Sequence, residues 1–289
     1  MRKQLPGFLF VLPALILLLV LMVYPLWQTV LFSFSDVSLP YFETKFVGLK
    51  HFIATVQRYE FPRIILNTLI WVFGSVLFQF TFAFAVALFL NNNFKGRIII
   101  QTIALLPWAI PSIVAGNTWK WIMQTDFGLL NAMLKQLGLA SLARPWLTDP
   151  SLALGSVLFA TIWQGYPFLM VMLLAGMKAI PQEQYEAAEV DGANAFQRLI
   201  SITIPNLKNI IVIVVMLQIV YAWNAFDLIF VMTGGGPGGA TEILGLFIYR
   251  LGLNEFNFSQ SSAVSVMLIG FVLLTMLIRN LLTRGEKIK

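Results

Sequence analysis

The chain has 289 residues, of which 58% are hydrophobic and 11% are charged, and its formal net charge is +6. A soluble domain carries about 25% charged residues. The composition, with a mean hydropathy of +0.82, therefore excludes an ordinary soluble protein and indicates an integral membrane protein.

The excess of basic residues does not predict nucleic-acid binding here. In a membrane protein such residues flank the spans and set their orientation, so we expect membrane lipid, and no nucleic acid, as a partner. The absence of cysteine excludes disulfides, thiol catalysis and thiolate metal sites. The single histidine, His51, lies in a polar loop and cannot form a metal site alone, so no metal site is expected.

Six apolar stretches reach the roughly 20 residues that a membrane-spanning helix needs. They are residues 8–34, 64–90, 98–122, 152–177, 210–232 and 261–282. The first follows Arg2 and Lys3, as a signal peptide would, but it is too long, contains Pro13 and Pro25, and lacks a small-x-small cleavage site. We therefore expect it to be retained as a span.

The basic residues outside the spans predict the orientation. With the N-terminus inside, the inner segments (1–6, 91–97, 178–208 and 279–289) hold 11 Lys and Arg in 55 residues. The outer segments (36–63, 120–150 and 233–259) hold 8 in 86. Because basic residues concentrate in cytoplasmic loops, both termini are predicted to be cytoplasmic.

Prolines and polar side chains occur within these apolar stretches. Pro107 and Pro111 interrupt the third and Pro167 the fourth, which a helical bundle tolerates because neighbours re-satisfy the freed carbonyls. Polar side chains within or near the spans are Gln79, Gln164, Gln218, Asn224 and Asp227. Each is compatible with helix packing or with a substrate path, and together they predict a polar interior.

The loop between the fourth and fifth spans, residues 178–209, has the pattern of two short helices. Pro181 suits a first helical turn, and the glutamates after it, beginning with Glu183, are favoured near a helix start. Gly192 suits a helix stop, and a second helical stretch over 193–204 is expected to end near Pro205. On pattern alone this could be a simple interfacial connector.

Three short runs in this loop carry a resemblance. They are Glu186-Ala187-Ala188, Asp191-Gly192-Ala193 and Ile202-Thr203-Ile204-Pro205. At this spacing they resemble the EAA loop of bacterial ABC importer permeases, in which the loop forms a coupling helix that docks on the ATPase subunit. The resemblance implies a polar contact by Glu186, close packing at Ala187 and Ala188, and a turn at Gly192. The implied coupling residues are Glu183, Glu186, Ala187, Ala188, Asp191 and Gly192.

A second segment, Trp223-Asn224-Ala225-Phe226-Asp227 followed by the glycine-rich residues 233–242, is similar to carbohydrate-uptake permeases of the maltose and maltodextrin type. Glycines 234, 236 and 239 also fit a nucleotide-binding fingerprint. A P-loop, however, needs lysine where Ala240 stands and must join a strand to a helix. We therefore expect a flexible outer loop that does not bind nucleotide.

Two helical faces are candidates for substrate contact. Thr161, Gln164, Gly165 and Phe168 share a face of the fourth span, and Val220, Asn224 and Asp227 share one of the fifth, with Trp223 beside them. Amides can hydrogen-bond a sugar and aromatic rings can stack on it, and Gly165 leaves room near the backbone. The family resemblance implies a sugar between these spans. The candidate substrate residues are Thr161, Gln164, Gly165, Phe168, Trp223 and Asn224, with helix packing as the alternative role.

Taken together, the sequence predicts an all-α membrane protein with six transmembrane helices, a single domain over 1–289 and the type I ABC importer permease fold. The expected function is the non-catalytic channel subunit of a binding-protein-dependent importer of a di- or oligosaccharide in a bacterial or archaeal inner membrane. The resemblance implies as partners a second homologous permease, two cytoplasmic ATPase subunits that bind ATP and Mg, and an extracytoplasmic sugar-binding protein. No cofactor is expected in this chain. Import of glycerol 3-phosphate or a polyol-like solute, and more distantly a membrane enzyme or channel, are the alternatives.

Overall fold

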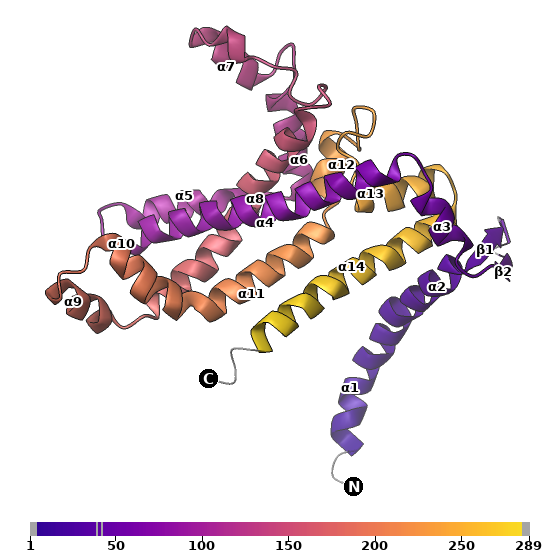
Figure 1. Ribbon diagram of the computed structural model, residues 1–289, viewed down its shortest axis with the longest axis horizontal. Helices are drawn as coiled ribbons and strands as arrows, with labels where there is room; N and C mark the ends of the chain where they lie inside the picture. The colour runs from indigo at the N-terminus through magenta and orange to yellow at the C-terminus, as the bar shows by residue number, and fades with distance from the viewer. Residues whose placement is uncertain (1–4, 39, 42, 285–289) are drawn as a thin grey trace. The chain divides into compact units, whose positions relative to one another are not determined.

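The computed structural model describes residues 5–38, 40–41 and 43–284, and the chain forms two compact units. The first unit contains the two ends of the chain, up to Ile64 and from Leu244, and the second contains residues 65–243. Both are built almost entirely from helices (Figure 1).

The first unit begins with one long helical segment made of α1 (Leu5–Leu18), the π-helical turn η1 (Leu19–Val23) and α2 (Tyr24–Ser33). Pro25 lies in the first turn of α2, where its missing N–H leaves a carbonyl of the preceding turn without its usual partner. The wider π-helical turn lies directly before this position. The wider turn therefore accommodates the proline, and the helical segment continues through it.

A small hairpin and three further helices complete this unit. Strands β1 (Ser35–Ser38) and β2 (Glu43–Phe46) pair antiparallel, with Asp36 opposite Lys45. The helices are α3 (Lys50–Val56), α13 (Leu244–Tyr249), the π-helical turn η4 (Arg250–Asn254) and α14 (Phe258–Arg284). Because α14 packs along α2 and against α3, the two ends of the chain are joined in one unit.

Asp36 is the centre of a small ionic cluster in the first unit. Its carboxylate lies 2.8 Å from Lys50 Nζ and 2.8 Å from His51 Nε2. The hydrogen bond from Lys50 holds the pKa of Asp36 below its ordinary value, and His51 acts in the same direction. The cluster thus ties β1 to the start of α3.

The second unit is a bundle arranged around α8. It contains most of α4 (Phe61–Asn91), then α5 (Arg97–Ala109), α6 (Ser112–Ile122), α7 (Leu129–Gln136), η2 (Ala140–Leu142), α8 (Ala153–Lys178), α9 (Gln182–Val190), α10 (Ala195–Arg198), η3 (Leu199–Thr203), α11 (Ile204–Trp223) and α12 (Asp227–Met232). Helix α8 packs against α5 and α11 (Figure 1). Gly176 permits this approach, since a Cβ there would collide with Leu207 and Ile210 of α11.

Helices long and apolar enough to cross a membrane match the predicted spans. Among the described residues they are Val11–Ser33, Phe61–Asn91, Ala153–Lys178, Ala195–Trp223 and Phe258–Leu277. The pair α5 and α6 makes a sixth span if it is counted as one, but it bends by 97° at its break. The predicted all-helical membrane fold is confirmed, and the third span is sharply broken rather than merely interrupted.

Two boundaries around the fifth span differ from the prediction. The helix ends at Trp223, so residues 227–232 form the separate helix α12 and do not continue the span to residue 232. At the other end, the helix expected to stop near Pro205 continues into α11 through the π-helical turn η3. Pro205 sits in the first turn of α11, where a missing N–H is tolerated.

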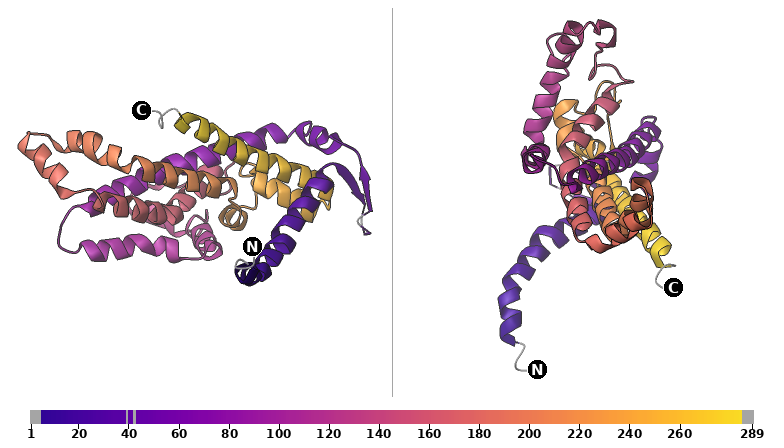
Figure 2. Two further views of the ribbon diagram at one scale, coloured as in Figure 1. Left: turned by 90° about the horizontal axis from the view of Figure 1, so that it is seen from below. Right: turned by 90° about the vertical axis from the view of Figure 1, so that its left-hand side faces the viewer.

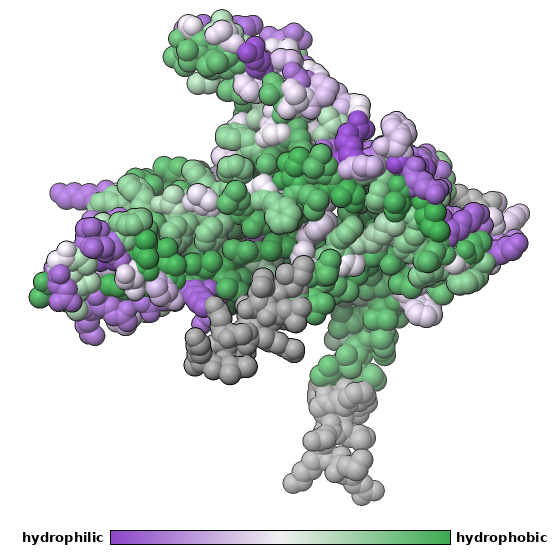
Figure 3. All heavy atoms as spheres, viewed as in Figure 1, coloured by the Kyte–Doolittle hydropathy of each residue, from purple (hydrophilic) through white to green (hydrophobic). Residues whose placement is uncertain are grey.

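The surface of the second unit separates by polarity. Helices α9 and α10 form a tip at one end of this unit (Figure 2), and hydrophilic residues gather over that tip (Figure 3). The flanks of the long helices are covered by hydrophobic residues (Figure 3), as a surface in contact with lipid requires. Exposed examples are Phe73, Leu77 and Ile99.

Candidate functional site

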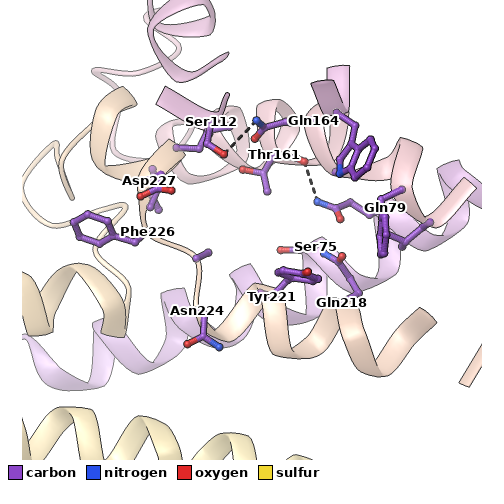
Figure 4. A pocket seen from close by; sticks show the side chains of 18 of the residues that line it. Ser75, Gln79, Ser112, Thr161, Gln164, Gln218, Tyr221, Asn224, Phe226 and Asp227 are labelled. Atoms are coloured by element: carbon purple, nitrogen blue, oxygen red, sulfur yellow. Dashed lines mark hydrogen bonds between the residues drawn. The ribbon is translucent and has the colours of Figure 1, made fainter. Parts of the chain in front are cut away.

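The second unit contains a cavity of about 600 Å³. It is bordered by the break between α5 and α6 and by the break between α11 and α12. This volume falls in the range of small-molecule sites, about 300–1,000 Å³. Its lining comes from α4, α5, α6, α8, α11 and α12, together with the two breaks. Polar and aromatic lining side chains (Figure 4) include Trp71, Ser75, Gln79, Trp108, Ser112, Thr161, Gln164, Phe168, Gln218, Tyr221, Asn224, Phe226 and Asp227.

The first break, between α5 and α6, follows from Pro111. Because proline disfavours the helical conformation in the residue before it, Ile110 is extended, with φ −83° and ψ 127°. The freed carbonyl of Ile110 then accepts a 3.0 Å hydrogen bond from Gln164 Nε2, which also lies 3.3 Å from Ser112 Oγ. Gln164 thus fixes the corner of the broken span while lining the cavity.

The second break lies between α11 and α12. Asn224 is the C-terminal cap of α11, and its Nδ2 donates a 2.8 Å hydrogen bond to Val220 O of its own helix. Its amide points away from Thr161 and Gln164 (Figure 4). Since the helix ends here, the predicted continuous face of Val220, Asn224 and Asp227 is wrong. Asp227 instead begins α12.

Gly165 and Gln79 explain the close approach of α8 and α4 beside the cavity. Gln79 Nε2 donates a 2.9 Å hydrogen bond to Thr161 O (Figure 4). A Cβ at Gly165 would lie 2.7 Å from Gln79 Oε1 and 2.8 Å from Nε2. The missing side chain therefore makes room for the amide of Gln79 and not, in this conformation, for a ligand.

Five of the six candidate substrate residues line the cavity: Thr161, Gln164, Gly165, Phe168 and Asn224. The sixth, Trp223, is only 5% exposed and is not among the lining residues. The ring of Phe168 stacks on Trp108, with centroids 5.8 Å apart, so the cavity also offers an aromatic surface. The role of all six in substrate binding stays a prediction.

Sequence reasoning missed the contribution of α4. Trp71, Ser75 and Gln79 follow one another at four-residue spacing and all line the cavity. That spacing was a usable signal, because residues i, i+4 and i+8 share one helical face. It was obscured because Trp71 and Ser75 are common in apolar spans, and only Gln79 was singled out as polar.

The cavity is electrostatically one-sided. Among the described residues that line it, Asp227 is the only acidic one, and none is Lys, Arg or His. The nearby basic residue Lys120 does not line this cavity. It donates to Val231 O of α12 at 3.2 Å and borders a smaller pocket. The cavity thus offers amides, hydroxyls, aromatic rings and one carboxylate.

The predicted coupling segment forms a well-defined helical hairpin. Helix α9 ends at Val190, and the chain turns at Gly192, which has φ +78°. There Ala193 N–H bonds Ala188 O at 2.9 Å and Gly192 N–H bonds Glu189 O at 3.0 Å. These two bonds form a Schellman motif, which ends a helix at a glycine. Asn194 then caps α10 through a reciprocal capping box with Gln197. The predicted stop at Gly192 is confirmed.

Side-chain contacts hold α9 against the helix that follows the hairpin. The hydroxyls of Tyr185 and Thr203 are 2.9 Å apart, and Asn206 donates to Gln184 at 3.0 Å. Glu189 forms an ion pair with Arg198. The hairpin is therefore attached to η3 and α11 by side-chain hydrogen bonds.

Most of the predicted coupling residues on this hairpin are exposed. Among the predicted coupling residues, Glu183, Glu186, Ala187, Asp191 and Gly192 are exposed and Ala188 is partly exposed. Two apolar side chains accompany them, Val190 at 88% and Phe196 at 68% exposure. Exposed apolar side chains rimmed by polar ones are found at protein-binding surfaces.

The glycine-rich loop after α12 is held in place by hydrogen bonds. Asn67 Nδ2 donates to Gly239 O and Glu242 O, each at 3.2 Å, and the Thr233 and Thr241 hydroxyls are 2.8 Å apart. The loop follows a helix, α12, so it lacks the strand-to-helix context of a nucleotide-binding loop. Hydrogen bonds to α4 and between two threonines thus hold this loop, and its expected flexibility stays a prediction.

A multi-pass helical membrane protein whose polar cavity lies at broken helices has the architecture of a solute permease. Residues 79–287 match the family described as binding-protein-dependent transport system inner membrane component. The chain belongs to this family.

Curated relatives cover nearly the whole chain. The trehalose/maltose transport system permease protein MalF of Thermococcus litoralis is 37% identical over 274 residues, which are 94% of this chain and 91% of the relative. The sulfoquinovosyl glycerol transport system permease protein SmoG of Agrobacterium fabrum is 32% identical over 257 residues, 89% of this chain and 83% of the relative.

Solved structures agree with the fold. A bacterial ABC transporter involved in the import of the acidic polysaccharide alginate contains a chain with a TM-score of 0.87 and 26% identity, over 98% of this chain and 96% of that one. A second alginate transporter structure, in complex with a pentasaccharide-bound periplasmic protein, has the same TM-score at 24% identity. The predicted ABC importer permease, a transport subunit and not an enzyme, is thus confirmed.

Proposed function

We propose that this chain is a membrane subunit of an ATP-driven importer of a neutral sugar, with a di- or oligosaccharide as the best candidate. The carrying observation is the cavity lining, which combines amides, hydroxyls and aromatic rings with no basic side chain. Amides and hydroxyls hydrogen-bond sugar hydroxyls, and aromatic rings pack on the apolar faces of sugar rings. The named substrates of the trehalose/maltose relative are of this kind.

The charge of the cavity favours a sugar over glycerol 3-phosphate, the main alternative. Phosphate sites in proteins commonly contain Arg or Lys, whereas the charged lining residue here is Asp227. Within this cavity an anionic solute meets a carboxylate of the same sign. The same charge also distinguishes the cavity from one suited to an acidic polysaccharide such as alginate.

The hairpin of α9 and α10 is proposed to face the cytoplasm and dock on an ATPase subunit. The exposed Glu183, Glu186 and Ala187 and the apolar Val190 and Phe196 support a protein-binding role. The proposed assembly contains a second homologous permease, two ATPase subunits that bind ATP and Mg, and an extracytoplasmic sugar-binding protein. Both termini of this chain then lie in the cytoplasm, in the inner membrane of a bacterium or archaeon.

Reconstitution tests the proposal. The chain is purified with its partner permease and ATPase subunits, placed in liposomes, and supplied with ATP and the binding protein. We expect ATP-dependent uptake of maltose, trehalose or another neutral oligosaccharide, and none of glycerol 3-phosphate or an alginate oligosaccharide. Uptake confined to the anionic solutes, or uptake without any ATPase subunit, contradicts it.

A further inference from the structure

Two buried polar atoms at the cavity have no hydrogen-bond partner among the described residues. They are the indole nitrogen Nε1 of Trp71 and the amide oxygen Oε1 of Gln79. Each side chain is only 1% exposed, and each belongs to a residue that lines the cavity. Buried polar groups in native proteins are nearly always paired, so each unpaired one requires an explanation.

The free end of Gln79 is fixed by its neighbour. Nε2 donates to Thr161 O, a backbone carbonyl that can only accept. Exchanging the two ends of the amide would place two acceptors against each other. The oxygen is therefore the end without a partner, and it needs a donor, while Trp71 Nε1 can only donate and needs an acceptor.

Helix packing alone does not account for this pair. A residue that only joined α4 to α8 would need the single bond to Thr161, yet the second end of the Gln79 amide is buried as well. Ser75, between the two on the same face, gives its hydroxyl hydrogen to Trp71 O and keeps its acceptor capacity. One face of α4 thus presents a donor, a hydroxyl oxygen and an acceptor in succession at the cavity.

We propose that Trp71, Ser75 and Gln79 form a subsite on α4 for the hydroxyl groups of the transported solute. The proposal rests on the function proposed above and specifies its chemistry. One hydroxyl can donate to Gln79 Oε1, and another can accept from Trp71 Nε1. Neither atom is reached by solvent in this conformation, so the subsite forms when the cavity opens around its solute.

The pair selects by chemical class. A carboxylate or ionised phosphate cannot donate to Gln79 Oε1, and an ammonium cannot accept from Trp71 Nε1. The α-carbons of these residues are eight positions apart, about 12 Å along the helix axis. Separate hydroxyls therefore serve the two groups, which favours a solute with several hydroxyls along its length.

Conservative variants test the subsite. Trp71→Phe keeps an aromatic ring and removes the donor. Gln79→Met keeps the chain length and removes both the acceptor and the bond to Thr161 O. Trp119→Phe is the matched control, because Trp119 packs against Phe159 and Trp163 and does not line the cavity. The measurement is equilibrium binding of radiolabelled maltose and trehalose to the assembled transporter, without the external binding protein.

The subsite predicts about fivefold weaker sugar binding in Trp71→Phe, the effect of one lost hydrogen bond. It predicts a loss at least as large in Gln79→Met, and no change in Trp119→Phe. A series of monodeoxy maltoses adds a test that begins with the wild-type transporter. The analogue that lacks the hydroxyl bonded by Trp71 should bind the wild-type transporter about fivefold more weakly than maltose does. Its affinity should be the same for the Trp71→Phe variant.

Equal binding by wild type and both variants, or equal binding of all deoxy analogues, overturns the subsite and leaves the sugar-importer function standing. Such a result assigns the two atoms to water or to packing. If the wild-type transporter binds neither these sugars nor any other neutral mono-, di- or oligosaccharide in a panel, the proposed function fails and the subsite fails with it.

Discussion

The amide of Gln164 donates a 3.0 Å hydrogen bond to the carbonyl of Ile110, across the corner where the third span turns by 97°. Because Ile110 is extended at the break before Pro111, its carbonyl does not accept the N–H of residue 114, as it would in a continuous helix. Gln164 supplies a donor from α8 instead. The contact therefore connects the shape of the cavity to the stability of the broken span.

Replacing Gln164 by Leu is expected to destabilise the protein by about 1–3 kcal/mol, because the Ile110 carbonyl is then left without a donor. The measurement is the thermal unfolding midpoint in detergent. Gln101→Leu is the control, since Gln101 lies on α5 but does not line the cavity. Equal midpoints for the two variants would show that the corner does not depend on Gln164.

Gly165→Ala is expected to displace the amide of Gln79, because the added Cβ would lie 2.7–2.9 Å from its atoms. The bond to Thr161 is then lost, and sugar binding weakens about fivefold or more. Gly155→Ala, on the same helix with open space around its Cβ, is the control and should bind normally. In a Gln79→Ala background the clash disappears, so Gly165→Ala should then have little further effect. A full effect in that background argues against this explanation.

Asp227 is expected to exclude anions from the cavity. In Asp227→Asn the repulsion is removed, so glycerol 3-phosphate should compete with maltose binding at least tenfold better than in wild type. Neutral sugars should bind within about threefold of wild type. Competition binding to the assembled transporter measures both. Unchanged competition by glycerol 3-phosphate would mean that Asp227 does not face the bound solute.

The Asp36 cluster predicts a pH-dependent contribution to stability. Its pKa is lowered, chiefly by the hydrogen bond from Lys50, so the contribution is present above the unfolded-state pKa near 4. It is lost as the pH falls through the lower pKa of the folded state. Asp36→Asn should therefore lower the unfolding midpoint at pH 7, and its difference from wild type should shrink as the pH falls below the unfolded-state pKa.

Glu43→Gln, an exposed carboxylate on β2, is the control for this experiment and should change the midpoint little at either pH. A difference between Asp36→Asn and wild type that stays the same from pH 7 to pH 3 would show that the carboxylate charge is not responsible.

Sequence reasoning gave the helical membrane fold because the physics of a span is local. Apolar runs of about 20 residues are needed wherever a helix crosses a bilayer, and Gly192 ends α9 through backbone freedom alone. The corner at Pro111 was visible as a proline pair. Its 97° bend was not, because the corner is also held by Gln164, which lies 54 positions away and bonds Ile110.

The cavity was only partly predictable for the same reason. Residues on α8 were found from their helical spacing, but Asn224 and Asp227 were placed on one helix that in fact ends at Trp223. The contribution of Trp71 and Ser75 depends on which face of α4 meets α8, a tertiary relation that periodicity in a uniformly apolar span does not reveal.

The most direct test of the importer function measures sugar uptake and retention of the ATPase subunit in one variant of the hairpin. Glu186→Lys reverses a charge on the exposed surface of α9, with Glu43→Lys as control. In proteoliposomes containing the complete transporter, Glu186→Lys should lose at least nine-tenths of ATP-dependent sugar uptake and retain less ATPase subunit on co-purification, while Glu43→Lys transports normally. ATP-dependent uptake by Glu186→Lys at the wild-type rate, with the ATPase fully retained, would contradict the coupling of this hairpin to transport.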